Sequence, residues 1–258
     1  MRNPKIEFDR LQMYFGEPYI IDLESAVGRI TVYQPTLGDV IALGEKNFYA
    51  TLNIFTTNTT AVKLELWENN IDWNELSDFE LFCMFKSQID PKASCLMFRD
   101  LDFSKFEIFQ KEIDGKVCLT LYNAENDIEI NEDVYHHISQ YLRNVFNTFP
   151  EEKITNDSIM KKWFIEKEKR QRERDKEKLE NGALDSYSIQ PIISACVNHP
   201  GFKYKLHELK QVGICEFYDS VQRLQVYEST TALMKGMYSG MIDSKNIKPD
   251  DYNFMKKL

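Results

Sequence analysis

The sequence predicts an α+β protein in three parts: an N-terminal α+β domain with a β-hairpin (1–150), a long charged connecting helix or linker (151–184) and an all-α C-terminal domain (185–258). Three observations predict this class. Alternating apolar residues, which are typical of strands, occur only in the first part. A run of charged residues at 161–180 follows that part. Beyond the run, apolar residues recur at helical spacing, and Gly and Pro are scarce throughout.

The first elements are two β-rich runs and a helix. Residues 19–34 contain both runs, with a loop or tight hairpin at 24–28 between them. Pro35-Thr36 then begins a helix that Thr36 can cap and that carries Asp39 in its first turn. Its expected apolar face consists of Val40, Ile41, Leu43 and Phe48.

Two helices and a short third one are predicted next. They cover 58–70 and 74–89, and Ser77 and Glu80 fit a capping box at the start of the second apolar run. The third begins at Asp90-Pro91 and continues through Phe98.

The strongest strand signal of the chain is at 106–122. Asp114-Gly115 predicts a type I′ turn between two alternating strands, so this segment is a β-hairpin. A third short strand is expected at 127–130. A helix then follows from Glu132 to Phe149, because apolar residues recur there at helical spacing.

The C-terminal half carries only helical patterns. One long helix is expected over 154–179 and a short one over 188–198, beginning near Pro191; HPGF at 199–202 is a turn. Residues 207–242 predict two helices, the first of them broken near Gly213. Gly236-Met237-Tyr238-Ser239-Gly240 stands where a helix ends, and helix C-capping explains its glycines.

The charge run at 161–180 combines nine basic and six acidic residues, a balance of +3. Its i,i+4 pairs include favourable ones, Glu166–Arg170 and Glu168–Arg172, and like-charge ones. Apolar residues nearly vanish after Ile165, so the run is predicted to be a solvent-exposed connecting helix or linker. A surface for an acidic partner protein is an alternative. Nucleic acid is disfavoured because six acidic groups repel phosphates and no aromatic residue interleaves the run.

Composition excludes several classes of protein. A net charge of −9 argues against broad contact with phosphates, and a 43% hydrophobic content argues against disorder. The five cysteines have no CxxC spacing and indicate reduced thiols of a cytoplasmic protein. The first ten residues have no apolar signal-peptide stretch, and no window is long and apolar enough for a membrane span.

Candidate chemical groups are few, and none defines a site. His136 and His137 are adjacent, so on a helix they point about 100° apart and cannot easily bind one metal; a surface ion pair of His137 with Asp133 is expected instead. Cys196, His199 and His207 lack a standard zinc spacing. No phosphate-binding, dinucleotide-binding or hydrolase motif occurs. We therefore expect no catalytic residue, no metal and no cofactor.

A methionine-rich set near the C-terminus is the candidate partner-binding surface. Met is unbranched and adaptable, and it recurs on surfaces that accept varied helices. One interpretation is a core helix with Met as filler, and the other is a groove for an amphipathic segment of a partner. The proposed contact residues are Leu233, Met234, Met237, Tyr238 and Met241, with Ile242 and Met255 nearby.

Four stretches together carry a family resemblance. They are VYQPTLGDVIALGEKNFY (32–49), LSDFELFCMF (76–85) with LMFRDLDFSKFEIF (96–109), ISACVNHPGFKYKLHELKQVGICEFYDSVQRLQ (193–225) and LMKGMYSGMID (233–243). The combination resembles proteins of tailed bacteriophages and prophages of Gram-positive bacteria that are commonly regarded as tail assembly chaperones. The resemblance covers most of the chain, and its pieces are family-like phrases rather than catalytic motifs.

The resemblance implies a non-enzymatic role in virion morphogenesis. Such chaperones bind the long, helical tape measure protein in the host cytoplasm, keep it soluble, and leave as tail tube subunits polymerise around it. The expected partners are therefore the tape measure protein and possibly the tail tube protein, and the chain possibly self-associates. Binding to nucleic acid or to a membrane is not expected. Two rival functions remain: a structural component of the phage tail or baseplate, and a small regulatory or enzymatic protein.

Overall fold

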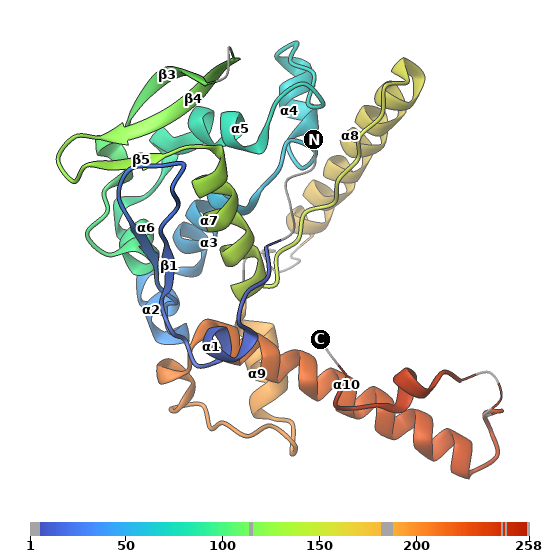
Figure 1. Cartoon of the computed structure of the whole chain (residues 1–258). Helices are drawn as coiled ribbons and strands as arrows, with labels where there is room; N and C mark the ends of the chain where they lie inside the picture. Colours follow the sequence, from blue (N-terminus) through green and yellow to red (C-terminus); the bar gives the residue numbers. More distant parts are fainter. Residues whose placement is uncertain (1–5, 114–115, 182–187, 244, 246, 257–258) are drawn as a thin grey trace.

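The computed structural model describes residues 6–113, 116–181, 188–243, 245 and 247–256 (Figure 1). It is a mixed α+β structure, as predicted, with small antiparallel sheets before residue 150 and, among the described residues, helices but no strands after it. The expected Asp114-Gly115 turn lies outside the described residues. The proposed boundaries at 150 and 185 stay a prediction.

The elements up to residue 150 alternate between short helices and strands. In order they are α1 (Arg10–Tyr14), β1 (Tyr19–Ile21), β2 (Ile30–Val32), α2 (Leu37–Leu43), α3 (Glu45–Thr56), α4 (Lys63–Glu68), α5 (Asp78–Phe85), η1 (Lys86–Gln88), α6 (Pro91–Phe98), η2 (Phe103–Lys105), β3 (Glu107–Ile113), β4 (Lys116–Asn123), β5 (Ile128–Ile130) and α7 (Glu132–Val145). The elements after residue 150 are α8 (Ser158–Glu180), α9 (Gln190–Val197), η3 (Leu209–Gln211), α10 (Ile214–Tyr238) and η5 (Pro249–Tyr252).

The strands form two separate antiparallel sheets. In the first, β1 pairs with β2, with Tyr19 opposite Val32. In the second, β4 lies between β3 and β5, with Phe109 opposite Thr120 and Leu121 opposite Ile130. The two sheets meet through the loop before β2, because the amide of Glu129 donates a 2.8 Å hydrogen bond to the carbonyl of Val27.

The main core is rich in aromatic side chains. The Phe55 ring lies 5.0 to 5.2 Å, centroid to centroid, from the rings of Phe82, Phe98 and Phe103. Helices α3, α5, α6 and α7 supply much of this core around the sheets. Residues distant in the sequence complete it, namely Ile189, Leu209, Val212, Ile214 and Phe217.

Several predicted helix starts are confirmed in detail. Thr36 and Asp39 form a capping box at the start of α2, and Ser77 and Glu80 form another at the start of α5. Asp90 caps α6, with Pro91 in its first turn. Each cap satisfies backbone amides that the first helical turn leaves without a partner.

Other helix boundaries differ from the prediction. The helix after Thr36 ends at Gly44, whose φ of +99° interrupts it, and α3 begins immediately afterwards. The segment 58–62 is a turn that precedes α4, because Asn58 accepts a hydrogen bond from the amide of Ala61 and favours a turn over a helix. Residues 207–242 contain the short η3 and one continuous helix, α10, rather than two helices.

Helix α8 is only partly the solvent-exposed connecting helix or linker that the charge run predicts. Its first half packs on the outer side of α4, where Ile165 is buried beside Leu64, Leu66 and Trp73 in a second, small core. Ion pairs flank this contact, including Lys63–Glu168 at 2.5 Å and Arg172–Glu65 at 2.5 Å. Residues 173–180 are all exposed, so only the second half is the solvated helix that the charge pattern indicates.

The extended segment before α8 is held against the body through its main chain. Its carbonyls at Glu151, Lys153 and Thr155 accept hydrogen bonds from side chains. The donors are the amide of Asn58 at 3.0 Å, the indole of Trp73 at 3.0 Å and the amide of Asn74 at 2.6 Å. This crossing leads the chain from α7 to the docked end of α8.

Candidate partner-binding surface

Helix α10 forms an arm that projects from the rest of the molecule (Figure 1). Of its residues only Ile214, Phe217 and Thr230 are buried, and the first two anchor its root in the main core. The rest of the helix runs outward, and the C-terminal segment folds back along it (Figure 1). We refer to residues 218–256 as the α10 arm.

The root of the arm is fixed by backbone hydrogen bonds to the start of α2. The amide of Leu37 donates to the carbonyl of Val212 at 2.9 Å, and the amide of Ile214 donates to the carbonyl of Pro35 at 3.1 Å. Gly38 allows this approach, because a Cβ there would lie 2.5 Å from the carbonyl oxygen of Lys210. The arm is therefore attached rigidly at its base.

The far end of α10 has the geometry of a Schellman motif. Gly240 has a φ of +74°, its amide donates to the carbonyl of Met237, and the amide of Met241 donates to the carbonyl of Gly236. Ile242 then packs on Gly236, where a Cβ would lie 2.5 Å from its Cδ1. C-capping thus explains Gly240, as predicted, while close packing against Ile242 explains Gly236.

None of the five predicted contact residues belongs to the core. Tyr238 is 84% exposed and Met241 is 87% exposed, while Met234 is exposed to a lesser extent. Leu233 and Met237 are half-buried. The structure brings all five together at the outer end of the arm, and it does so on a projecting helix.

The tail of the chain adds further apolar residues to the arm. The guanidinium of Arg223 donates hydrogen bonds to the carbonyls of Phe254 and Lys256, at 2.6 and 3.0 Å. The rings of Tyr227 and Phe254 make an edge contact, with centroids 6.3 Å apart. Met255 remains exposed beside them. The methionine-rich pattern predicts Met255 near this surface, whereas no pattern in the sequence indicates Arg223.

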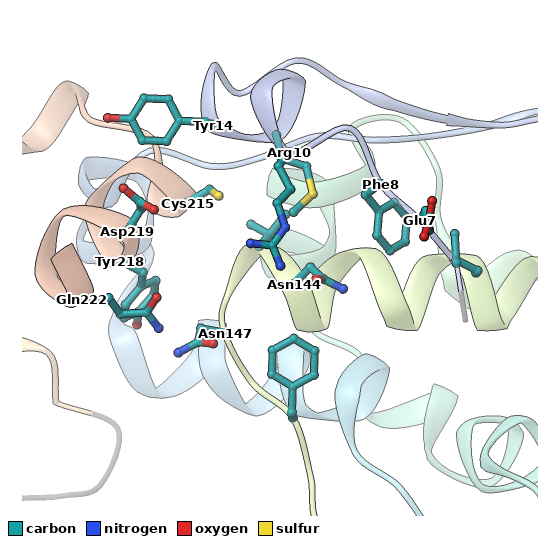
Figure 2. A pocket seen from close by; sticks show the side chains of 14 residues that line it. Glu7, Phe8, Arg10, Tyr14, Asn144, Asn147, Cys215, Tyr218, Asp219 and Gln222 are labelled. Carbon is teal, nitrogen blue, oxygen red and sulfur yellow. The ribbon is translucent and has the colours of Figure 1, made fainter. Parts of the chain in front are cut away.

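A cavity of about 390 Å³ lies at the root of the arm (Figure 2). The N-terminal segment, the end of α7 and the first turns of α10 meet there, and no motif in the sequence marks this cavity. Figure 2 shows polar side chains from all three, among them Arg10, Asn144, Asn147, Asp219 and Gln222. Their amide and charged groups can form hydrogen bonds and ion pairs with a polar ligand.

The thiol in this cavity is not activated for nucleophilic chemistry. Burial, with a smaller contribution from the nearby charges of Asp219 and Glu216, raises the pKa of Cys215 to about 11. A thiol with this pKa stays protonated at neutral pH, and the thiolate is the reactive form.

The candidate histidines and cysteines do not converge on one site. The hydroxyl of Tyr19 lies 2.7 Å from Nδ1 of His137, and the predicted ion pair of His137 with Asp133 is not among the ion pairs of the described residues. Burial is the main cause that lowers the pKa of His137, and the charge of His136 adds to it. His199 lies instead 3.3 Å from a carboxylate oxygen of Glu228. Among the described residues, no group of three or more His, Cys, Asp or Glu side chains is arranged to hold a metal ion.

Comparison with known protein families gives a match for the C-terminal part of the chain. Residues 176–258 match the family model of the YomV second domain, so this part of the chain is similar to a phage- or prophage-associated family. The matched region contains α9 and the whole α10 arm. No curated protein and no solved structure matches the chain. Within the described part of the chain, no helix is long and apolar enough to cross a membrane.

Proposed function

We propose that this chain is a non-enzymatic tail assembly chaperone that binds the helical tape measure protein of its phage in the host cytoplasm. The observation that carries the proposal is the gathering of exposed apolar side chains at the outer end of the α10 arm, above all Tyr238 and Met241. The match of this region to a phage-associated family supports a role in the phage life cycle.

The physical argument starts from the client. A tape measure protein is long and helical, and its apolar stripes aggregate unless another surface covers them. Methionine side chains adapt to varied apolar surfaces, so an arm that carries Met234, Met237 and Met241 suits a client whose stripe changes along its length. A net charge of −9 keeps several copies on one client dispersed. Tail tube protein is then a competing partner that displaces the chaperone.

Co-expression with the tape measure protein of the same phage tests the proposal. The parent chain is expected to raise the soluble fraction of the client and to co-purify with it. The double variant Tyr238→Ser/Met241→Ser should lose most of both effects. The control is Ile159→Ser, which removes an apolar side chain that is 75% exposed on α8, outside the arm. Equal client solubility with both variants would refute the arm as the binding surface.

A protein inventory of washed virions separates the proposal from the rival structural role. A chaperone leaves before the particle is complete and should be absent from purified virions, whereas a tail or baseplate component is present in fixed stoichiometry. Alanine replacement of Met234, Met237 and Met241 addresses the regulatory or enzymatic rival. Tail assembly that survives this replacement, together with loss of another measurable activity, would favour that rival.

A further inference from the structure

Strand β3 is an open edge of the three-stranded sheet (Figure 1). Its one partner among the described strands is β4, and the opposite edge of the sheet is covered by the loop that contacts Glu129. All residues from Glu107 to Glu112 are exposed, including the apolar Ile108 and Phe109. A long exposed edge of this kind offers backbone groups for pairing with another chain.

The side chains of β3 are arranged so that the strand complements itself. Glu107, Phe109 and Lys111 share one face, since successive residues of a strand point to opposite faces. Two copies of β3 can pair antiparallel around a two-fold axis, in which case residue i of one copy faces residue j of the other with i + j constant. The charges decide which register is favourable.

Only the register centred on Phe109 pairs opposite charges. It places Glu107 of each copy opposite Lys111 of the other, with the two Phe109 rings adjacent at the axis. A register centred on Gln110 would place Ile108 opposite Glu112. A register centred on Lys111 would place the two Lys111 side chains opposite each other, which is unfavourable.

Glu107 is available for these pairs, and Lys111 is engaged within the sheet in the single copy. Glu107 makes no ion pair or side-chain hydrogen bond with the described residues. Lys111 contacts both carboxylate oxygens of the buried Glu129, at 2.8 and 3.1 Å. Glu129 lies on β5, beyond β4, so this ion pair draws the Lys111 ammonium across the sheet. The Lys111 side chain is 55% exposed, so it can turn back to the free edge, where its ammonium pairs with Glu107 of a second copy.

We propose that the chain self-associates as a two-fold dimer through antiparallel β3–β3 pairing, with the axis at Phe109. The pairing joins the two three-stranded sheets into one sheet of six strands and covers Phe109 and Ile108. The β3 edge is on the opposite part of the molecule from the α10 arm, so the dimer presents two arms (Figure 1). This inference does not depend on the client of the arm.

Sedimentation equilibrium of the full chain measures the dimer directly. The parent should change from the 30.4 kDa mass of one chain to twice that mass within a range of about 1–100 μM. Glu107→Lys places two like-charge pairs at the interface and should raise the dimer Kd by about tenfold or more. The control Glu112→Lys makes the same charge change on the other face of the strand and should leave the Kd within about twofold.

A parent chain that stays monomeric up to the highest concentration would overturn the proposal. Equal effects of the two lysine variants would also overturn it, since the register predicts that only Glu107 has a charged partner. Circular dichroism of both variants checks that the exposed substitutions leave the fold intact.

Disulfide formation tests the register without relying on affinity. Opposite residues of an antiparallel pair have Cα atoms about 4.5–5.5 Å apart, which a disulfide can span. In a Cys95→Ser/Cys118→Ser background, Phe109→Cys should give a covalent dimer under mild oxidation. Val117→Cys, at a site that is 68% exposed on the same hairpin but on β4, should not. Equal yields from the two variants would contradict a two-fold axis at Phe109.

Discussion

The substitution Gly38→Ala probes the contact that holds the α10 arm to the body. A Cβ at position 38 would lie 2.5 Å from the carbonyl oxygen of Lys210 and 3.2 Å from its carbonyl carbon. Both obstructing atoms are backbone, so no side-chain rotation relieves the overlap. The methyl group must therefore push η3 away from α2. This displacement weakens the two backbone hydrogen bonds that the amides of Leu37 and Ile214 donate across the contact.

Two opposing contributions set the magnitude. Overpacking a tight contact costs about 1–3 kcal/mol, and each backbone hydrogen bond that opens costs about 1 kcal/mol more. Against this, alanine is favoured over glycine inside a helix by at most about 1 kcal/mol. Since the steric cost is larger, we expect Gly38→Ala to lower the free energy of unfolding by about 1–3 kcal/mol.

Urea denaturation measures this change, and Gly213 supplies the matched control. Gly213 lies at the same contact, where it forms an antiparallel β-bridge with Thr36. A Cβ at position 213 would meet no atom within 4 Å, and the backbone φ of −61° suits any residue. Gly213→Ala should therefore be neutral or stabilising by up to about 1 kcal/mol. Finding Gly38→Ala as stable as the parent, or more stable, would refute the assignment of a close backbone contact at this point.

Three further predictions concern other contacts. Arg143→Met should cost about 3 kcal/mol in urea denaturation, because the guanidinium donates at 2.8 Å to the carbonyls of Thr56 and Thr57 and pairs with Asp78. Ile165→Ala should cost about 2–4 kcal/mol and speed amide hydrogen exchange in α8 while exchange in β4 stays unchanged. The folded-state pKa of His137 is lowered from 6.5, so the unfolded chain binds more protons and stability falls as the pH drops through about 6.5. His137→Gln should flatten this dependence between about pH 7.5 and 5.5, and an unchanged slope would rule out His137 as its source.

Local signals predicted much of the fold. The capping boxes of Thr36 and Ser77, the α6 start at Asp90-Pro91 and the strands at 106–122 and 127–130 depend on neighbouring residues, and the structure contains them. The break at Gly44 and the turn at 58–62 were missed, since the apolar spacing continues across both.

Long-range contacts were beyond the sequence patterns. The docking of α8 depends on single side chains, Ile165 and Glu168, that meet α4 about 100 residues away, so no periodic apolar face marks it. The apolar residues of the candidate site were recognised from methionine content. Their position on a projecting arm depends on Gly38 and Val212, which lie far from them in the sequence.

The crossing at 151–155 has a consequence for how the chain can vary. Its path is specified by the side chains of Asn58, Trp73 and Asn74, which donate hydrogen bonds to its backbone carbonyls. Every amino acid has such a carbonyl group. Substitutions within the crossing itself should therefore be widely tolerated, whereas the three donor positions, 58, 73 and 74, should accept few other residues. A foreign peptide sequence transplanted into 151–155 would then follow the same route over the surface.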